Sequence, residues 1–183
     1  FIADDAGIID LVMHPQNPDI LFAASWNRIR NTEESIVDGD DAKIWRTTDG
    51  GDTWQMLENG LPQQDMSRIG LAISNDKVFA VYVNTSYELD NVYVSSDNGD
   101  SWAATTGNAG AILGGFGWYF GKVVVNPTND DEIYVLGVDL HRSLDGGQTW
   151  ATATPPWWQY SVHADKHSLH FSDANTLLLA TDG

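Results

Sequence analysis

One eight-residue pattern occurs three times in this chain, and it constrains the fold more than any other feature. The pattern is Ser/Thr-x-Asp-x-Gly-x-Ser/Thr-Trp, and its copies begin at residues 47, 95 and 143, each 48 residues after the last. A constant period of this length is typical of repeat architectures, in which each repeat is one supersecondary unit. The chain is therefore predicted to consist of repeated units of similar structure.

Each copy carries the residues of a tight turn between two strands. The central Asp-Gly-Gly or Asp-Asn-Gly sequence tolerates the positive φ angles that such turns need. The Asp carboxylate can accept hydrogen bonds from N–H groups of its own turn, and the Trp offers a large apolar surface for burial. A structural role is expected for Asp49, Gly51, Trp54, Asp97, Gly99, Trp102, Asp145, Gly147 and Trp150.

The three motifs resemble Asp boxes, also called bacterial neuraminidase repeats. Asp boxes occur in sialidases, sortilin-type receptors, xyloglucanase-type glycoside hydrolases and a photosystem assembly factor. The resemblance implies an all-β chain folded as a β-propeller, with one box between the third and fourth strands of each four-stranded antiparallel blade. Because these families include enzymes, receptors and assembly factors, the resemblance predicts the fold far better than the function.

The strand pattern predicts slightly under four blades in one partial propeller that covers residues 1–183. Short apolar runs bounded by turn residues recur in each unit. The predicted blades cover approximately 7–58, 67–106, 118–153 and an incomplete 162–183. An unclosed ring leaves two unpaired sheet edges, so we expect a fragment of a larger propeller. Further blades of the same chain or a partner chain would cover the exposed faces.

The charge of the chain limits its partners. It has 26 Asp and Glu against 9 Lys and Arg, a net charge of −17. Such a surface repels phosphate backbones and anionic lipids, so no nucleic acid is expected as a partner. It favours cationic partners or Ca²⁺, although solubility alone explains the same charge. No apolar run is long enough for a transmembrane segment.

The closest resemblance is to sortilin-like and xyloglucanase-like secreted bacterial propeller proteins, over nearly the whole chain. It is carried by four stretches: residues 10–15, Asn59-Gly60-Leu61-Pro62, Arg68-Ile69-Gly70 and His163-x-Asp165-x-His167. The resemblance implies a secreted, periplasmic or cell-surface location in a bacterium. A start at Phe1 without a preceding Met is expected of a processed or truncated product.

The propeller resemblance also predicts where a ligand binds. The first strand of each blade lines the central channel, and the leading ends of these strands form a mouth. Aromatic side chains there can stack on sugar rings or on a partner's apolar surface, or they can pack between blades. The candidate ligand-binding residues are Arg68, Trp118, Tyr119, Trp157, Trp158 and Tyr160.

The pattern His163-x-Asp165-x-His167 is the strongest candidate for chemistry. In a regular strand, alternation would place all three side chains on one face. Two imidazoles and a carboxylate could hold a divalent metal such as Zn²⁺ or Ca²⁺, or the Asp could orient a His for proton transfer. Alternatively, this is a polar inner strand whose His side chains bond to backbone groups or water. No cofactor is assigned, and the catalytic candidates are Asp10, His163, Asp165 and His167.

Two enzyme classes can be compared with the sequence. A sialidase needs an arginine cluster that grips the substrate carboxylate, but Arg46 and Arg142 lie beside Asp boxes and the family's Arg-Ile-Pro element is missing. In xyloglucanase-type enzymes an Asp after the second strand acts as general base, and residues 25–28 at the equivalent place lack a carboxylate. The leading hypothesis is an extracytoplasmic interaction or scaffold propeller that binds a protein or glycan at the channel mouth. A glycoside hydrolase or metal-assisted hydrolase is the alternative.

Overall fold

The computed structural model describes residues 2–107, 111–154, 159, 162–173 and 176–182. The described residues form strands, turns and bends without a helix, which confirms the prediction of an all-β chain. None of them belongs to a helix that could cross a membrane.

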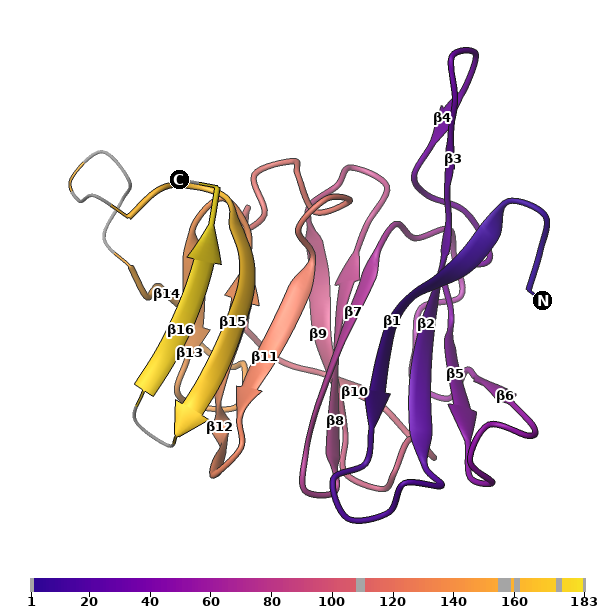
Figure 1. Ribbon diagram of the computed structural model, residues 1–183, viewed down its shortest axis with the longest axis horizontal. Coiled ribbons are helices and arrows are strands. Elements are labelled where there is room, and N and C mark those ends of the chain that lie inside the picture. Colours follow the sequence, from indigo (N-terminus) through magenta and orange to yellow (C-terminus); the bar gives the residue numbers. More distant parts are fainter. Residues whose placement is uncertain (1, 108–110, 155–158, 160–161, 174–175, 183) are drawn as a thin grey trace.

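Three four-stranded antiparallel sheets, blades 1 to 3, follow one another along the chain (Figure 1). Blade 1 contains β1 (Ala6–Met13), β2 (Leu21–Asn27), β5 (Ile44–Thr47) and β6 (Gln55–Leu57). Blade 2 contains β7 (Ile69–Ser74), β8 (Lys77–Val83), β9 (Leu89–Ser95) and β10 (Ala103–Ala104). Blade 3 contains β11 (Lys122–Asn126), β12 (Asn129–Leu136), β13 (Leu140–Ser143) and β14 (Ala151–Thr152).

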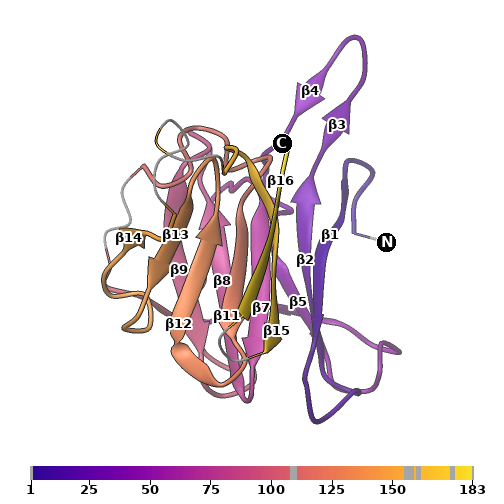
Figure 2. The same cartoon turned by 60° about the vertical axis from the view of Figure 1, so that its left-hand side comes forward.

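Two smaller sheets complete the described structure. The strands β15 (Lys166–Asp173) and β16 (Thr176–Thr181) pair beside blade 3, and we call this sheet blade 4. The strands β3 (Ile29–Arg30) and β4 (Ser35–Ile36) form a hairpin that projects from blade 1 (Figure 2).

The core consists of apolar layers between blades. Along β8, Val78, Ala80 and Tyr82 pack toward blade 1, whereas Phe79 and Val81 pack toward blade 3. Successive side chains of a strand point to opposite faces of its sheet. A strand in a blade that is covered on both faces by other blades must therefore be apolar at every position. This explains why the central strands appear in the sequence as continuous apolar runs.

The inner strands β1, β7, β11 and β15 lie next to one another in that order. In Figure 1, β1, β11 and β15 all begin at the upper end, from which the β3–β4 hairpin also projects. The turn between β5 and β6, which holds the first Asp box, lies at the opposite end. The leading ends of the inner strands, which we call the mouth, are therefore far from this box.

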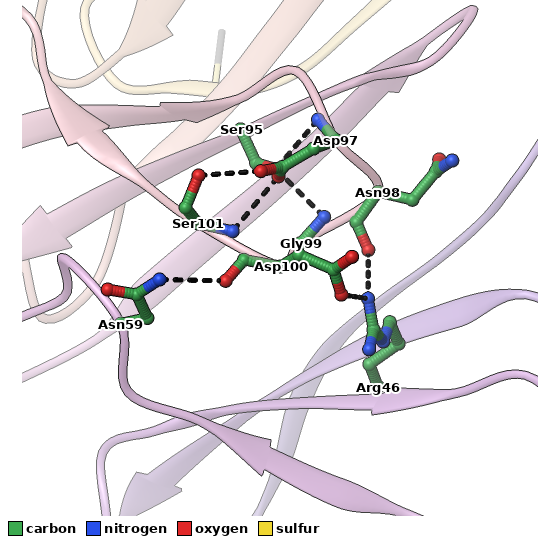
Figure 3. A network of polar contacts seen from close by, with 8 residues as sticks. All are labelled: Arg46, Asn59, Ser95, Asp97, Asn98, Gly99, Asp100 and Ser101. Carbon is green, nitrogen blue, oxygen red and sulfur yellow. Dashed lines mark hydrogen bonds and ion pairs between the residues drawn. The ribbon is translucent and has the colours of Figure 1, made fainter.

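Each box closes its turn with the same hydrogen bonds. In the second copy, Ser95 Oγ donates to Asp97 Oδ1 (2.7 Å) and accepts from Gly99 N (2.8 Å). The Asp97 carboxylate also accepts from the backbone N (2.9 Å) and Oγ (2.6 Å) of Ser101 (Figure 3). The first and third copies repeat this pattern. The glycine of each copy has a positive φ, as the turn requires.

The second box also joins blade 2 to blade 1. Arg46 Nη1, on β5, donates to Asn98 O and Asp100 Oδ1, both at 2.6 Å (Figure 3). Trp102 is only 6% exposed because it packs into the layer between blades 1 and 2, whereas Trp54 is 40% exposed. Blade 1 has no described neighbour on the side of Trp54, so a box tryptophan is buried only where another blade adjoins it.

Replacement of Gly60 tests how tightly the blades are joined. Gly60 has a φ of 84°, and a Cβ there would collide with the backbone carbonyl of Trp102 in the neighbouring blade. We expect Gly60→Ala to lower the free energy of unfolding by about 2–4 kcal/mol, measured by urea denaturation with tryptophan fluorescence. Gly7→Ala is the control, because a Cβ at Gly7 meets nothing within 4 Å. Equal stability of the two variants would contradict this account of the junction.

The pH dependence of stability tests the box carboxylates. Hydrogen bonds from Ser101 and Ser95 lower the pKa of Asp97 to about 2, and those from Thr149 and Ser143 do the same for Asp145. Their stabilising effect is complete above the unfolded-state pKa, about 4, and is lost as the pH falls toward about 2. We expect Asp97→Asn to reduce the loss of stability in this window, measured by denaturant midpoints at a series of pH values. Asp52→Asn, which removes an exposed charge of the first box, should leave the loss of stability in this pH range unchanged.

Candidate functional site

The mouth brings together several cations that form no ion pair with any described residue. Arg68 lies just before β7, Lys122 begins β11, and Arg28 follows β2. Among the described residues, no carboxylate lies within ion-pairing distance of these three side chains, although the chain has 26 acidic residues. Unpaired cations in so acidic a chain make the mouth the best candidate for a ligand site.

Trp26 holds two of these cations together. The Cζ atoms of Arg28 and Arg68 lie 5.0 and 5.8 Å from the centre of the Trp26 ring, within the range of cation–π contacts. The indole N–H donates to Val37 O (2.8 Å), which fixes the ring. A guanidinium over an aromatic ring keeps its N–H donors at the edge free for a carboxylate or phosphate.

Arg68 is the most buried of the three cations. Its Nη1 donates to Tyr119 O (3.1 Å), while its Nε is buried without a partner among the described residues. Burial lowers the pKa of Arg68, and the nearby Arg28 lowers it further, while Asp10 acts in the opposite direction. A guanidinium nevertheless stays charged in proteins, so Arg68 keeps a charge that the chain itself neutralises only in part.

Asp10 joins two inner strands. Its Oδ1 accepts a hydrogen bond from Leu11 N and its Oδ2 from Leu71 N on β7, both at 2.9 Å. Each carboxylate oxygen is thus already engaged by a backbone N–H group. This geometry suits a link between blades 1 and 2, and the catalytic role of Asp10 stays a prediction.

The trio His163, Asp165 and His167 does not share one face of a strand as expected. The strand β15 begins only at Lys166, and Asp165 has a φ of 67° because its N–H is drawn to Val138 O (3.0 Å). The described residues contain no group of three or more His, Asp or Glu side chains that could hold a metal ion. The expectation of a shared face was wrong, and the predicted Zn²⁺ or Ca²⁺ site has no geometric support in the described part of the chain.

Each member of the trio has a different environment. His163 is exposed, with its Nδ1 2.9 Å from Ala164 O. His167 Nε2 lies 2.5 Å from Asp182 Oδ1, and the His167 ring packs against Tyr119 and Phe120. These contacts make His167 part of the junction between blades 3 and 4.

Two lysines reinforce the same junction. Lys122 Nζ donates to His167 O (2.8 Å), and Lys166 Nζ donates to His163 O (2.6 Å) and Val138 O (3.2 Å). Lys166 is only 1% exposed, and burial lowers its pKa. Sequence reasoning placed the segment from His163 to His167, which includes Lys166, at the mouth but missed Lys122.

Trp118 and Tyr119 lie in a turn, not at the start of a strand as predicted. Gly114, Gly115 and Gly121 all have positive φ, so the chain between β10 and β11 coils back before β11 begins at Lys122. The rings of Trp118, Tyr119 and Phe120 pack in succession, with centroids 5.5 and 5.1 Å apart. The other predicted ligand residues, Trp157, Trp158 and Tyr160, lie outside the described residues.

Substitution of Asp10 tests its structural role. Asp10→Ala leaves Leu71 N without its acceptor, so we expect a loss of about 1–2 kcal/mol in the free energy of unfolding. Asp10→Asn keeps one acceptor oxygen and should lose less. Urea denaturation followed by tryptophan fluorescence measures both. If neither variant were less stable than the unsubstituted protein, the proposed link between β1 and β7 would be wrong.

Searches against protein-family models and curated proteins found no match. Solved structures do match, among them the GH74 enzyme of Niastella koreensis, with a TM-score of 0.61 and 20% identity over 96% of this chain and 26% of that enzyme. The GH74 xyloglucanase of Xanthomonas campestris gives 0.57 and 17% identity, over 89% of this chain and 25% of the xyloglucanase. YCF48 bound to a D1 peptide gives 0.55 and 15% identity, over 81% of this chain and 40% of YCF48.

This chain spans less than half the length of each of these proteins. All three are β-propeller proteins, and identities this low carry information on the fold alone. Together with the four-stranded antiparallel sheets, the likeness shows that this chain has a β-propeller fold.

Proposed function

We propose that this chain is an interaction module that binds an extended segment of a partner protein at the mouth. The observation that carries the proposal is that three cations, Arg28, Arg68 and Lys122, have no ion-pair partner among the described residues of a chain of net charge −17. Leaving them unpaired gives up favourable electrostatic energy in the free protein. A ligand that carries a carboxylate would recover this energy, because charge-assisted hydrogen bonds from guanidinium groups are strong.

One of the similar structures supports a peptide as the ligand. YCF48, whose fold is similar, has been solved with a D1 peptide bound. The aromatic rings beside the cations add apolar contact area of the kind that anchors peptide segments. A location outside the cytoplasm, as the sequence led us to expect, is part of the proposal.

The outer face of blade 1 is proposed as a second contact region, for further blades of the same chain or for a partner chain. Ile8, Leu11 and Trp54 are exposed there and line a hollow of about 490 Å³. Exposed apolar groups on a blade face correspond to those that the other blades bury against each other.

The alternative function is a glycoside hydrolase, which the likeness to GH74 enzymes favours. Hydrolysis of this kind needs two carboxylates on either side of the scissile bond. Both carboxylate oxygens of Asp10 are engaged by backbone N–H groups, and residues 25–28, where that family has its general base, lack a carboxylate. Peptide binding therefore remains the better supported function.

Selection of peptides from a random display library on the immobilised chain tests the proposal. We expect bound peptides to carry acidic groups, and their affinity to fall as the salt concentration rises. The double variant Arg28→Gln/Lys122→Met should weaken binding about tenfold or more in fluorescence anisotropy, because two charge contacts are lost.

Arg142→Gln is the matched control, because it removes an exposed cation of blade 3 next to the third Asp box. Its affinity for the selected peptides should not change. Failure to select any peptide, together with release of reducing sugars from a polysaccharide panel, would favour the hydrolase instead.

A further inference from the structure

A pocket of about 330 Å³ opens beside the unpaired cations of the mouth. Four aromatic side chains from the turn between β10 and β11 form most of its wall, and Val138 and Asp165 complete it. The aromatic residues are Phe116, Trp118, Tyr119 and Phe120. Among the described residues that line the pocket, Asp165 is the only charged one.

The exposed rings lie on a turn between two blades that both have described neighbours. Phe116 is 51% exposed and Tyr119 is 49% exposed, although their turn connects blades 2 and 3, and each of these blades has a described sheet on both sides. The exposed side chains of β1, by contrast, lie on a blade with only one described neighbour. Solvent-exposed aromatic rings at an inner position of the fold indicate a surface kept for a ligand.

The turn that carries the rings is held in place by its backbone. Phe116 N donates to Leu113 O, and Phe120 N donates to Phe116 O, both at 3.0 Å. Gly117 N donates to Tyr87 O (2.8 Å), and a Cβ at Gly117 would lie 2.5 Å from Val83 Cγ1, so only glycine fits this approach. A wall fixed before binding loses little conformational entropy when a ligand enters.

Asp165 supplies the charge of the pocket. Its carboxylate accepts no hydrogen bond from any described residue, and the nearby ammonium of Lys166 points instead to His163 O and Val138 O. Asp165 has a positive φ, its N–H donates to Val138 O, and it lies just before the start of β15. The pocket thus combines aromatic side chains with a carboxylate that has no hydrogen-bonded partner in the described part of the chain.

Aromatic faces and a carboxylate together bind organic cations. The face of each ring attracts an ammonium or guanidinium group, and a carboxylate adds a charge-assisted hydrogen bond. A sugar ring can stack on the same faces, but its hydroxyls need several polar partners, and this lining offers one charged group. The net charge of −17 likewise attracts basic partners.

We infer that the pocket binds a lysine or arginine side chain of the partner segment, an inference that rests on the proposed function. Tyr119 connects the two parts of the site, because its ring lines the pocket while its carbonyl oxygen accepts from Arg68 Nη1. A basic side chain in the pocket therefore lies next to the cations that attract a carboxylate. The partner segment should carry a basic residue within a few residues of an acidic group.

Small amides test the pocket independently of any peptide. The probes are Nα-acetyl-lysine amide and Nα-acetyl-arginine amide, with Nα-acetyl-norleucine amide as the uncharged comparison. We expect the basic probes to bind in the millimolar range, to shift the Trp118 indole N–H resonance, and to show upfield shifts of their terminal CH₂ protons from ring currents. The Trp118→Phe variant assigns the indole resonance.

The variant Asp165→Asn removes the charge without disturbing the fold, because Asn adopts positive φ at least as readily as Asp. We expect it to weaken binding of the basic probes about tenfold and to leave norleucine amide unaffected. Asp4→Asn, at an exposed carboxylate outside the pocket, should change neither. Equal binding of norleucine and lysine amides, unchanged binding to Asp165→Asn, or a shift of Trp118 only with cellotetraose would overturn the inference.

The outcomes also separate this inference from the proposed function. If library peptides bind at the mouth but show no enrichment of lysine or arginine, the pocket assignment is wrong and the proposed function stands. If the amides bind as expected but no peptide is selected, the pocket assignment stands and the proposed function is wrong.

Discussion

The packing of one sheet face against the next is the interaction on which the rest of this structure depends. The side chains of β8 point alternately toward blade 1 and blade 3, and Phe79 and Tyr82 are buried on opposite faces of the same strand. Without its neighbours, blade 2 would expose both of these apolar faces to solvent. The candidate site inherits this dependence, because Arg68 and Tyr119 come from adjacent blades and meet only when those blades are packed.

The Asp-box end of the blades and the mouth differ in the kind of contacts they contain. At the Asp-box end, local hydrogen bonds close each turn, and in blades 1 and 2 Arg46 joins the second box to the strand beside it. At the mouth, hydrogen bonds from Leu71 N to Asp10 and from Lys122 to His167 O also join neighbouring blades. The mouth nevertheless also holds exposed rings and cations without an ion pair among the described residues, groups that do little for stability and are available to a ligand.

What the sequence could predict follows from the range of the interactions involved. An Asp box is local, so Asp97, Gly99 and Ser101 reveal the turn without any knowledge of the fold. The trio from His163 to His167 was misplaced because Asp165 takes its conformation from Val138, more than twenty residues away. The contact of Arg68 with Trp26 is longer in range still, and no spacing rule in the sequence predicts it. The fold and the Asp-box turns were predictable from the sequence. The geometry of the mouth was not, because it depends on contacts between blades.

The charges at the mouth are kept apart by the backbone. Lys166 lies beside Asp165 in the sequence, yet its ammonium group donates to carbonyl oxygens, as does that of Lys122. Arg68 donates to a carbonyl as well, and Asp10 accepts only from backbone N–H groups. A mouth that neutralised itself would attract no charged ligand. Because backbone groups hold these side chains in place, opposite charges remain available side by side, and a partner would be selected by the order of its own charges.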